Sequence, residues 1–103
     1  MNKIVTLCGS MRFKKEMLYI SEKLELKEKY LVIQCIYSNE DNKLTKEEID
    51  LLGELHYKKI EISDAIFVVN VGGYIGQSTK NEIEYARSLN KEILSLEPIN
   101  LCP

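Results

Sequence analysis

The fold of this chain is decided by one short stretch, Ala65-Ile66-Phe67-Val68-Val69-Asn70, which leads into Val71-Gly72-Gly73-Tyr74-Ile75-Gly76. Its first five residues are all apolar, and a continuous apolar run of this length is typical of a strand buried on both faces. Three of the chain's five glycines follow within seven residues. The stretch therefore predicts a buried parallel strand with a glycine loop at its carboxyl end.

Three further apolar runs have the same character, and segments with helical spacing separate them. The runs cover residues 4–8, 30–36 and 92–96. Apolar residues at spacings of four, three and four predict the buried face of a first helix, at Phe13, Met17, Ile20 and Leu24.

Two more helices are predicted between the later runs. Thr45-Lys46-Glu47-Glu48 has the form of a capping box, which predicts a helix over residues 46–63. Its inward residues are predicted to be Ile49, Leu52 and Leu55. A third helix over residues 79–90 would turn Ile83 and Ala86 toward the sheet and end at Asn90 in a left-handed conformation.

The resulting order, βαβαβαβ, predicts an α/β fold in a single domain over residues 1–103. Right-handed crossovers make a three-layer α/β/α, doubly wound parallel sheet the simplest topology. We expect four strands, or five, in the order 2-1-3-4. Ligands of such sheets bind beyond the carboxyl ends of the strands, where the strand order reverses, so residues 9–12, 36–39 and 70–82 are the candidate segments.

Composition and charge exclude several functions. The net charge of −2 and the absence of long like-charge blocks argue against a nucleic acid polymer as partner. No apolar run reaches the roughly 18 residues of a membrane span, so we expect a cytoplasmic protein without membrane contact.

The three cysteines are an odd number without a CxxC pair, so neither a disulfide framework nor a zinc site is indicated. We expect Cys8 and Cys35 to be core-filling thiols, and we expect no metal and no cofactor.

The segment Cys8-Gly9-Ser10-Met11-Arg12 combines a glycine, a hydroxyl and a guanidinium at a predicted helix start. Such a start binds anions through its free amides, but Ser10 would equally serve as a plain helix cap. The glycine loop at residues 72–76 likewise suits either a close backbone approach to a ligand or a tight turn. Asn70 would point at ligand hydroxyls, whereas a structural role is the default for Asp64.

Glu82 is the sharpest catalytic candidate, because it lies near the start of the third helix beside the glycine loop. There its carboxylate would serve as a nucleophile or as an acid/base group. The alternative is a second capping box, Thr79-Lys80-Asn81-Glu82, in which Glu82 only caps the helix. His56, the one histidine, is expected to be a packed or surface imidazole rather than a base.

Two segments together resemble the nucleoside 2-deoxyribosyltransferase superfamily, including its 2'-deoxynucleoside 5'-phosphate N-hydrolase branch. The first is Val5-Thr6-Leu7-Cys8-Gly9-Ser10-Met11-Arg12. The second begins at Ser63-Asp64, continues through the strand and the glycine loop, and includes Asn81-Glu82-Ile83-Glu84-Tyr85-Ala86 and Asn90-Lys91. The compact pattern also resembles short relatives of this superfamily in bacteria and their phages.

The resemblance implies a flavodoxin-like fold and an enzyme that cleaves or transfers the N-glycosidic bond of a nucleoside or nucleotide. Glu82 matches the family's nucleophilic glutamate, which favours the catalytic interpretation over the cap. By matching positions, Gly9, Ser10 and Arg12 would border the sugar or its 5'-phosphate, and Asp64 or Asn70 would fix the sugar. Gly76 and Ser78 would lie near a phosphate.

Two departures from the family pattern bear on activity, because Glu84 and Asn90 stand where the family has glycine. They keep open the alternative of a nucleotide-binding module without catalysis. Family members are also longer and borrow residues across a dimer. A homodimer or higher homo-oligomer is therefore a further expectation.

Overall fold

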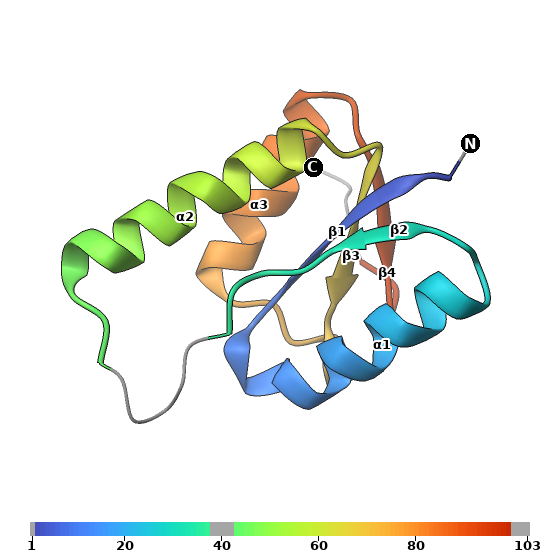
Figure 1. Ribbon diagram of the computed structural model, residues 1–103, viewed down its shortest axis with the longest axis horizontal. Helices are drawn as coiled ribbons and strands as arrows, with labels where there is room; N and C mark the ends of the chain where they lie inside the picture. The colour runs from blue at the N-terminus through green and yellow to red at the C-terminus, as the bar shows by residue number, and fades with distance from the viewer. Residues whose placement is uncertain (1, 38–42, 100–103) are drawn as a thin grey trace.

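The computed structural model describes residues 2–37 and 43–99, which form a parallel sheet with helices on both faces (Figure 1). Residues 38 and 39 of the candidate segment 36–39 and the third cysteine, Cys102, lie outside the described residues. The elements in chain order are β1 (Ile4–Gly9), η1 (Met11–Phe13), α1 (Lys14–Leu26), β2 (Leu31–Ile33), α2 (Lys46–Glu61), β3 (Ala65–Val69), η2 (Val71–Gly73), α3 (Gln77–Ser88) and β4 (Glu92–Ser95).

The four described strands pair in the order β2-β1-β3-β4, and every pair is parallel. This confirms the predicted strand order and the flavodoxin-like, three-layer α/β/α architecture. Strand β1 occupies the position where the strand order reverses: Val5 pairs with Val32 of β2 on one side and with Ala65 of β3 on the other.

The two faces of the sheet carry different numbers of helices. Helix α1 covers one face alone, while α2 and α3 lie together on the other (Figure 1). The α1 core is built on Leu7, Phe13, Met17, Leu24 and Val69. The opposite core is built on Cys8, Ile60, Ile66, Val68, Ile83 and Ala86. Alternate residues of β1 and β3 thus supply both cores, as the side-chain period of a strand requires.

Helices α1 and α2 test the predicted spacing in different ways. The predicted inner face of α1 is confirmed, and so is the capping box of α2, in which Thr45 and Glu48 bond reciprocally. The inward residues of α2 differ from the prediction: His56 and Ile60 are buried, whereas Ile49 and Leu55 are exposed. The helix face that packs on the sheet is therefore rotated around the helix axis relative to the predicted one. No helix in the described parts of the chain has the length and apolar character needed to cross a bilayer.

The carboxyl end of β3 is tied to the segment after β4 by a buried asparagine. Asn70 is fully buried; its Nδ2 donates to the Glu97 carbonyl at 3.0 Å, and its Oδ1 accepts from the Glu97 amide at 2.9 Å. The carboxylate of Glu97 in turn accepts a hydrogen bond from the Gly72 amide. This clamp uses the Asn70 amide for the fold, so the side chain does not point at a ligand.

We predict that Asn70→Ala lowers the free energy of unfolding by about 2 kcal/mol, because two backbone groups of Glu97 lose their partners in a partly buried site. Urea unfolding measures the change. The matched control is Asn81→Ala, which removes an exposed asparagine that bonds only to Gln77 on the same helix and should cost less than about 0.5 kcal/mol. Equal effects of the two substitutions would refute the clamp.

Candidate functional site

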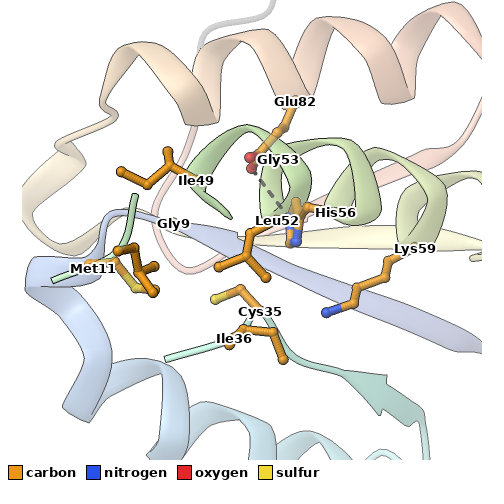
Figure 2. Close-up of a pocket in the computed structure, with 11 residues that line it drawn as sticks. Gly9, Met11, Cys35, Ile36, Ile49, Leu52, Gly53, His56, Lys59 and Glu82 are labelled. Carbon is orange, nitrogen blue, oxygen red and sulfur yellow. Dashed lines mark ion pairs between the residues drawn. The ribbon is translucent and has the colours of Figure 1, made fainter. Parts of the chain in front are cut away.

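A cavity of about 420 Å³ opens at the carboxyl end of β1, between the segment after β2 and the inner side of α2 (Figure 2). Its walls are mainly apolar, and its titratable side chains come from Cys35, His56, Lys59 and Glu82. The apolar part of the lining includes Met11, Ile36, Leu44, Ile49 and Leu52. Size and lining fall within the range of small-molecule sites, in which a few polar groups orient a ligand against apolar walls.

Glycine fits the close packing where β1 meets this cavity. A side chain at Gly9 would stand 3.1 Å from the backbone carbonyl oxygen of Val69 and 3.3 Å from the sulfur of Met17. A Cβ at the point where the chain turns away from the sheet would therefore be crowded, and its neighbours on β3 and α1 would have to shift by a few tenths of an ångström.

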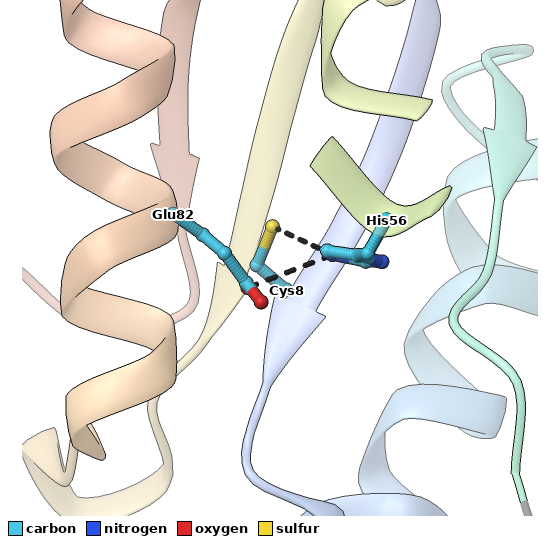
Figure 3. Close-up of side chains that lie close together, drawn as sticks. All are labelled: Cys8, His56 and Glu82. Atoms are coloured by element: carbon cyan, nitrogen blue, oxygen red, sulfur yellow. Dashed lines mark hydrogen bonds and ion pairs between the residues drawn. The ribbon is translucent and has the colours of Figure 1, made fainter. Parts of the chain in front are cut away.

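Three side chains from three elements converge at the inner end of the cavity (Figure 3). The Nε2 atom of His56, on α2, lies 3.5 Å from Sγ of Cys8, on β1, and 3.5 Å from Oε1 of Glu82, on α3. Cys8 is fully buried, and the side chains of His56 and Glu82 retain only 9% and 17% exposure. The helix pair α2 and α3 thus closes over β1 with a histidine and a glutamate facing each other.

Burial shifts the protonation of all three groups. It raises the pKa of the Glu82 carboxyl to about 7, against a weaker opposing effect of the Cys8 hydrogen bond. It lowers the pKa of His56 to about 4, and the nearby positive charge of Lys59 adds to this shift. Burial also raises the pKa of the Cys8 thiol well above its usual value, and the neighbouring Glu82 carboxylate contributes. At neutral pH the cluster thus holds a thiol, a neutral imidazole and a carboxyl group close to half-ionised.

The arrangement does not suit a cysteine nucleophile. In a cysteine–histidine relay, the base meets the nucleophile through one ring nitrogen and its orienting partner through the other. Here the same Nε2 atom faces both Cys8 and Glu82. Cys8 is also fully buried and is held as a thiol, whereas Glu82 reaches the cavity wall. The reactive group that this site presents to a ligand is therefore the carboxyl of Glu82.

The structure separates the predicted site residues into two sets. Gly9 and Glu82 line the cavity. Ser10 lies next to it at the end of β1, where its Oγ accepts a hydrogen bond from the Arg12 amide at 3.3 Å, so it caps the short helix η1. The Arg12 guanidinium stacks on the Tyr74 ring at 4.0 Å.

The remaining candidates lie away from the cavity wall. Gly76 and Ser78 lie at the start of α3, where Gly76 is the N-cap and Ser78 is exposed. Asp64 lies at the opposite, amino edge of the sheet, and its carboxylate accepts a hydrogen bond from the Ile4 amide at 2.8 Å. Asp64 therefore has the structural role that was expected by default, and it lies away from the cavity.

The glycine loop is a turn closed by the chain itself. Gly72 and Gly73 have positive φ angles of 65° and 82°, which few other residues adopt. Glu97 supplies the carboxylate at the Gly72 amide. The tight-turn interpretation therefore describes this loop, and the anion at its amide is a side chain rather than a ligand.

The alternative capping role of Glu82 is wrong. Helix α3 begins at Gln77, so Thr79 lies inside the helix, where its side chain is buried. Glu82 is consequently in the second turn, and its carboxylate contacts His56 instead of a helix-terminal amide.

His56 and Lys59 line the cavity, although neither was predicted to do so from the sequence. Both lie on the rotated inner stripe of α2, one turn apart. The available signal was the spacing of Leu52, His56 and Ile60 at intervals of four, which predicts one helix face as well as the spacing of Leu52 and Leu55 does. Cys8, His56 and Glu82 also bring together a thiol, an imidazole and a carboxylate. Their ligand atoms all lie within 4.8 Å of one another, and such a set is suited to a metal ion.

The opposite pKa shifts of Glu82 and His56 predict that their effects on stability cancel between about pH 4.5 and 6.5. The raised pKa of Glu82 contributes stability below pH 4.5 that is lost as the pH rises toward 7. The lowered pKa of His56 contributes stability above pH 6.5 that is lost as the pH falls toward 4. Folded and unfolded chains each hold one proton on the pair in this interval.

Single substitutions should reveal the separate contributions of Glu82 and His56 to the pH dependence of stability. Relative to wild type, the free energy of unfolding of Glu82→Gln should rise by about 3 kcal/mol from pH 4.5 to 7, and that of His56→Gln should fall by about 3 kcal/mol from pH 4 to 6.5. Urea unfolding across this pH series measures the differences, and groups shared with wild type cancel. Slopes of the same sign in both variants would contradict the opposite shifts.

Comparisons with known proteins extend the description of the fold only. No protein-family model matches the chain, and no curated protein matches it. A solved structure with a similar fold is a conserved protein from Enterococcus faecalis V583, with 11% sequence identity and a TM-score of 0.65. The similarity covers 92% of this chain and 63% of that protein, so this chain spans less than two thirds of its length.

Proposed function

We propose that this protein cleaves or transfers the N-glycosidic bond of a nucleoside or nucleotide, with Glu82 as the nucleophile. The observation that carries the proposal is the position of the Glu82 carboxylate on the wall of a largely apolar cavity at the switch point of the sheet. Apolar side chains from α2 and from the segment after β2 suit the flat face of a nucleobase.

The reaction would proceed in two displacements at the anomeric carbon. A Glu82 oxygen forms a bond to this carbon while the carbon–nitrogen bond breaks, and the electron pair leaves with the base, which takes a proton from solvent. Water or a second base then attacks the same carbon, releases the Glu82 carboxylate and, in the hydrolytic case, yields the free sugar. Glu82 is the only carboxylate on the cavity wall within the described residues, so it is the carboxylate assigned to the attack, and solvent rather than a second carboxyl group supplies the proton to the departing base.

The state of Glu82 supports a nucleophilic role. Its pKa of about 7 means that about half of the Glu82 side chains are carboxylates at neutral pH. Because Glu82 is largely buried, this carboxylate is poorly hydrated. A poorly hydrated carboxylate gives up less solvation when it attacks carbon. The sugar and any 5'-phosphate would lie toward Gly9, which lines the cavity at the end of β1, and toward Ser10 and Arg12, which follow it in the chain.

A second candidate function is a nucleotide-binding module that performs no chemistry. Asn70 and Asp64 favour it, because both use their side chains within the fold and leave fewer polar groups to fix a sugar. In this case the same cavity would hold the ligand and Glu82 would only contact it.

The test is incubation with a panel of deoxynucleosides and their monophosphates, with release of free base measured by chromatography. We expect base release from wild type and a loss of at least about 1000-fold in Glu82→Gln and Glu82→Ala, because the covalent step needs the carboxylate. The matched control is Glu84→Gln, which neutralises an exposed glutamate two residues along the same helix and outside the cavity, and should retain activity.

Equal base release by wild type and Glu82→Ala would show that Glu82 is not the nucleophile. Thermal stabilisation of wild type by a nucleotide, with no base released from any member of the panel, would favour the binding module instead.

A further inference from the structure

We propose that Cys8, His56 and Glu82 form a binding site for one divalent cation of the zinc class, with a fourth ligand position open to the cavity. The site is built from one residue on each of β1, α2 and α3, so no local sequence spacing reports it. The expectation of a metal-free protein rested on such spacing.

The separations of the ligand atoms match a tetrahedral zinc ion. Zinc binds a cysteine sulfur at about 2.3 Å, a histidine nitrogen at about 2.0 Å and a carboxylate oxygen at about 2.1 Å. With tetrahedral angles, these bonds place neighbouring ligand atoms about 3.3–3.6 Å apart. The structure has Nε2 of His56 at 3.5 Å from Sγ of Cys8 and at 3.5 Å from Oε1 of Glu82. The sulfur and the carboxylate oxygen lie within 4.8 Å, and rotation of the longer Glu82 side chain would close this third edge.

The direction of the imidazole also favours a shared ligand. One ring nitrogen faces both of the other groups, so the three atoms form a triangle rather than a linear chain of hydrogen bonds (Figure 3). A triangle of three ligand atoms leaves one position above it for a cation. Sulfur, nitrogen and oxygen together select zinc and similar ions, because magnesium and calcium prefer sites made of oxygen alone.

The surroundings provide both rigidity and access. The Cys8 backbone is held in the centre of the sheet by pairing with β3, and His56 and Glu82 project from two helices packed on the same core. His56 and Glu82 also line the 420 Å³ cavity, through which an ion would enter and in which water or a ligand would complete its coordination. On binding, the sulfur–metal bond replaces the sulfur–hydrogen bond of Cys8, and the proton passes to the buffer.

The metal site would regulate the proposed activity through Glu82. A cation that holds this carboxylate prevents its attack on a sugar carbon, so the metal-bound protein would be inactive as a glycosidase. This consequence rests on the proposed function, whereas binding of the cation does not. Binding is therefore tested by a signal that needs no turnover, and the two proposals fail separately.

The experiment titrates the metal-free chain, kept reduced without added thiols, with Co²⁺ and then with Zn²⁺. We expect one Co²⁺ per chain with visible bands of tetrahedral cobalt and a thiolate-to-cobalt charge-transfer band, both of which Zn²⁺ removes by displacement. Mg²⁺ should neither bind in calorimetry nor displace Co²⁺. His56→Gln and Glu82→Gln should each weaken Zn²⁺ binding by at least about 100-fold, because each removes a direct ligand.

The thiol variants assign the sulfur. Cys8→Ala and Cys8→Ser should lose the charge-transfer band, and thermal unfolding of the metal-free proteins checks that both are folded. The matched control is the double variant Cys35→Ala/Cys102→Ala, which leaves Cys8 as the sole cysteine and should keep the band. Failure of wild type to bind one Co²⁺ or Zn²⁺ per chain would overturn the site. A band that persists in either folded Cys8 variant, one that is absent from the double variant, or one that forms in His56→Gln at the same Co²⁺ concentration as in wild type would overturn it as well.

Discussion

Strand β1 is paired on both edges and covered on both faces, and the remaining elements take their places from this one constraint. Residues Val5 to Cys8 of this strand are completely buried. A parallel strand in this position needs helices above and below it. Its two neighbours, β2 and β3, are reached by crossovers on opposite faces, so α1 lies on one side of the sheet and α2 with α3 on the other (Figure 1). The chain segments that leave β1 and β2 must therefore diverge, and the cavity forms beside the end of β1.

Burial near this cavity acts on acids and bases in opposite directions. The same loss of hydration raises the pKa of Glu82 and lowers that of His56, since in each case the charged form is the one that burial penalises. Between about pH 4.5 and 6.5 the folded pair therefore holds one proton, on Glu82, and His56 is neutral. The cavity thus holds a carboxyl group that changes its ionisation close to physiological pH, which is unusual for glutamate and typical of functional sites.

The chemically prominent glycine loop contributes to the fold more than to the site. Its Gly72 amide donates to the Glu97 carboxylate, and the Asn70 side chain hydrogen-bonds both the amide and the carbonyl of Glu97. The segment after β4 therefore fills the place that an anionic ligand would take in a phosphate-binding loop. The ionisable groups His56, Lys59 and Glu82 of the cavity lie instead on the inner faces of α2 and α3.

The sequence alone determined the order of the elements, the strand order β2-β1-β3-β4, the inner face of α1, the capping box of α2 and the left-handed end at Asn90. Each of these depends on local spacing, on capping chemistry or on the handedness of crossovers, and all three can be read along the chain. The sequence also singled out Glu82, but it left open whether that residue caps α3 or faces a cavity.

Tertiary structure decided that question and the composition of the site. The start of α3 at Gln77 moved Glu82 beyond capping reach, and the rotation of α2 brought His56, rather than Leu55, to the interior. Both depend on how two helices pack against each other and against β1, which involves residues dozens of positions apart. The meeting of Cys8, His56 and Glu82 is thus a property of packing, because their separations in the chain carry no periodic signal.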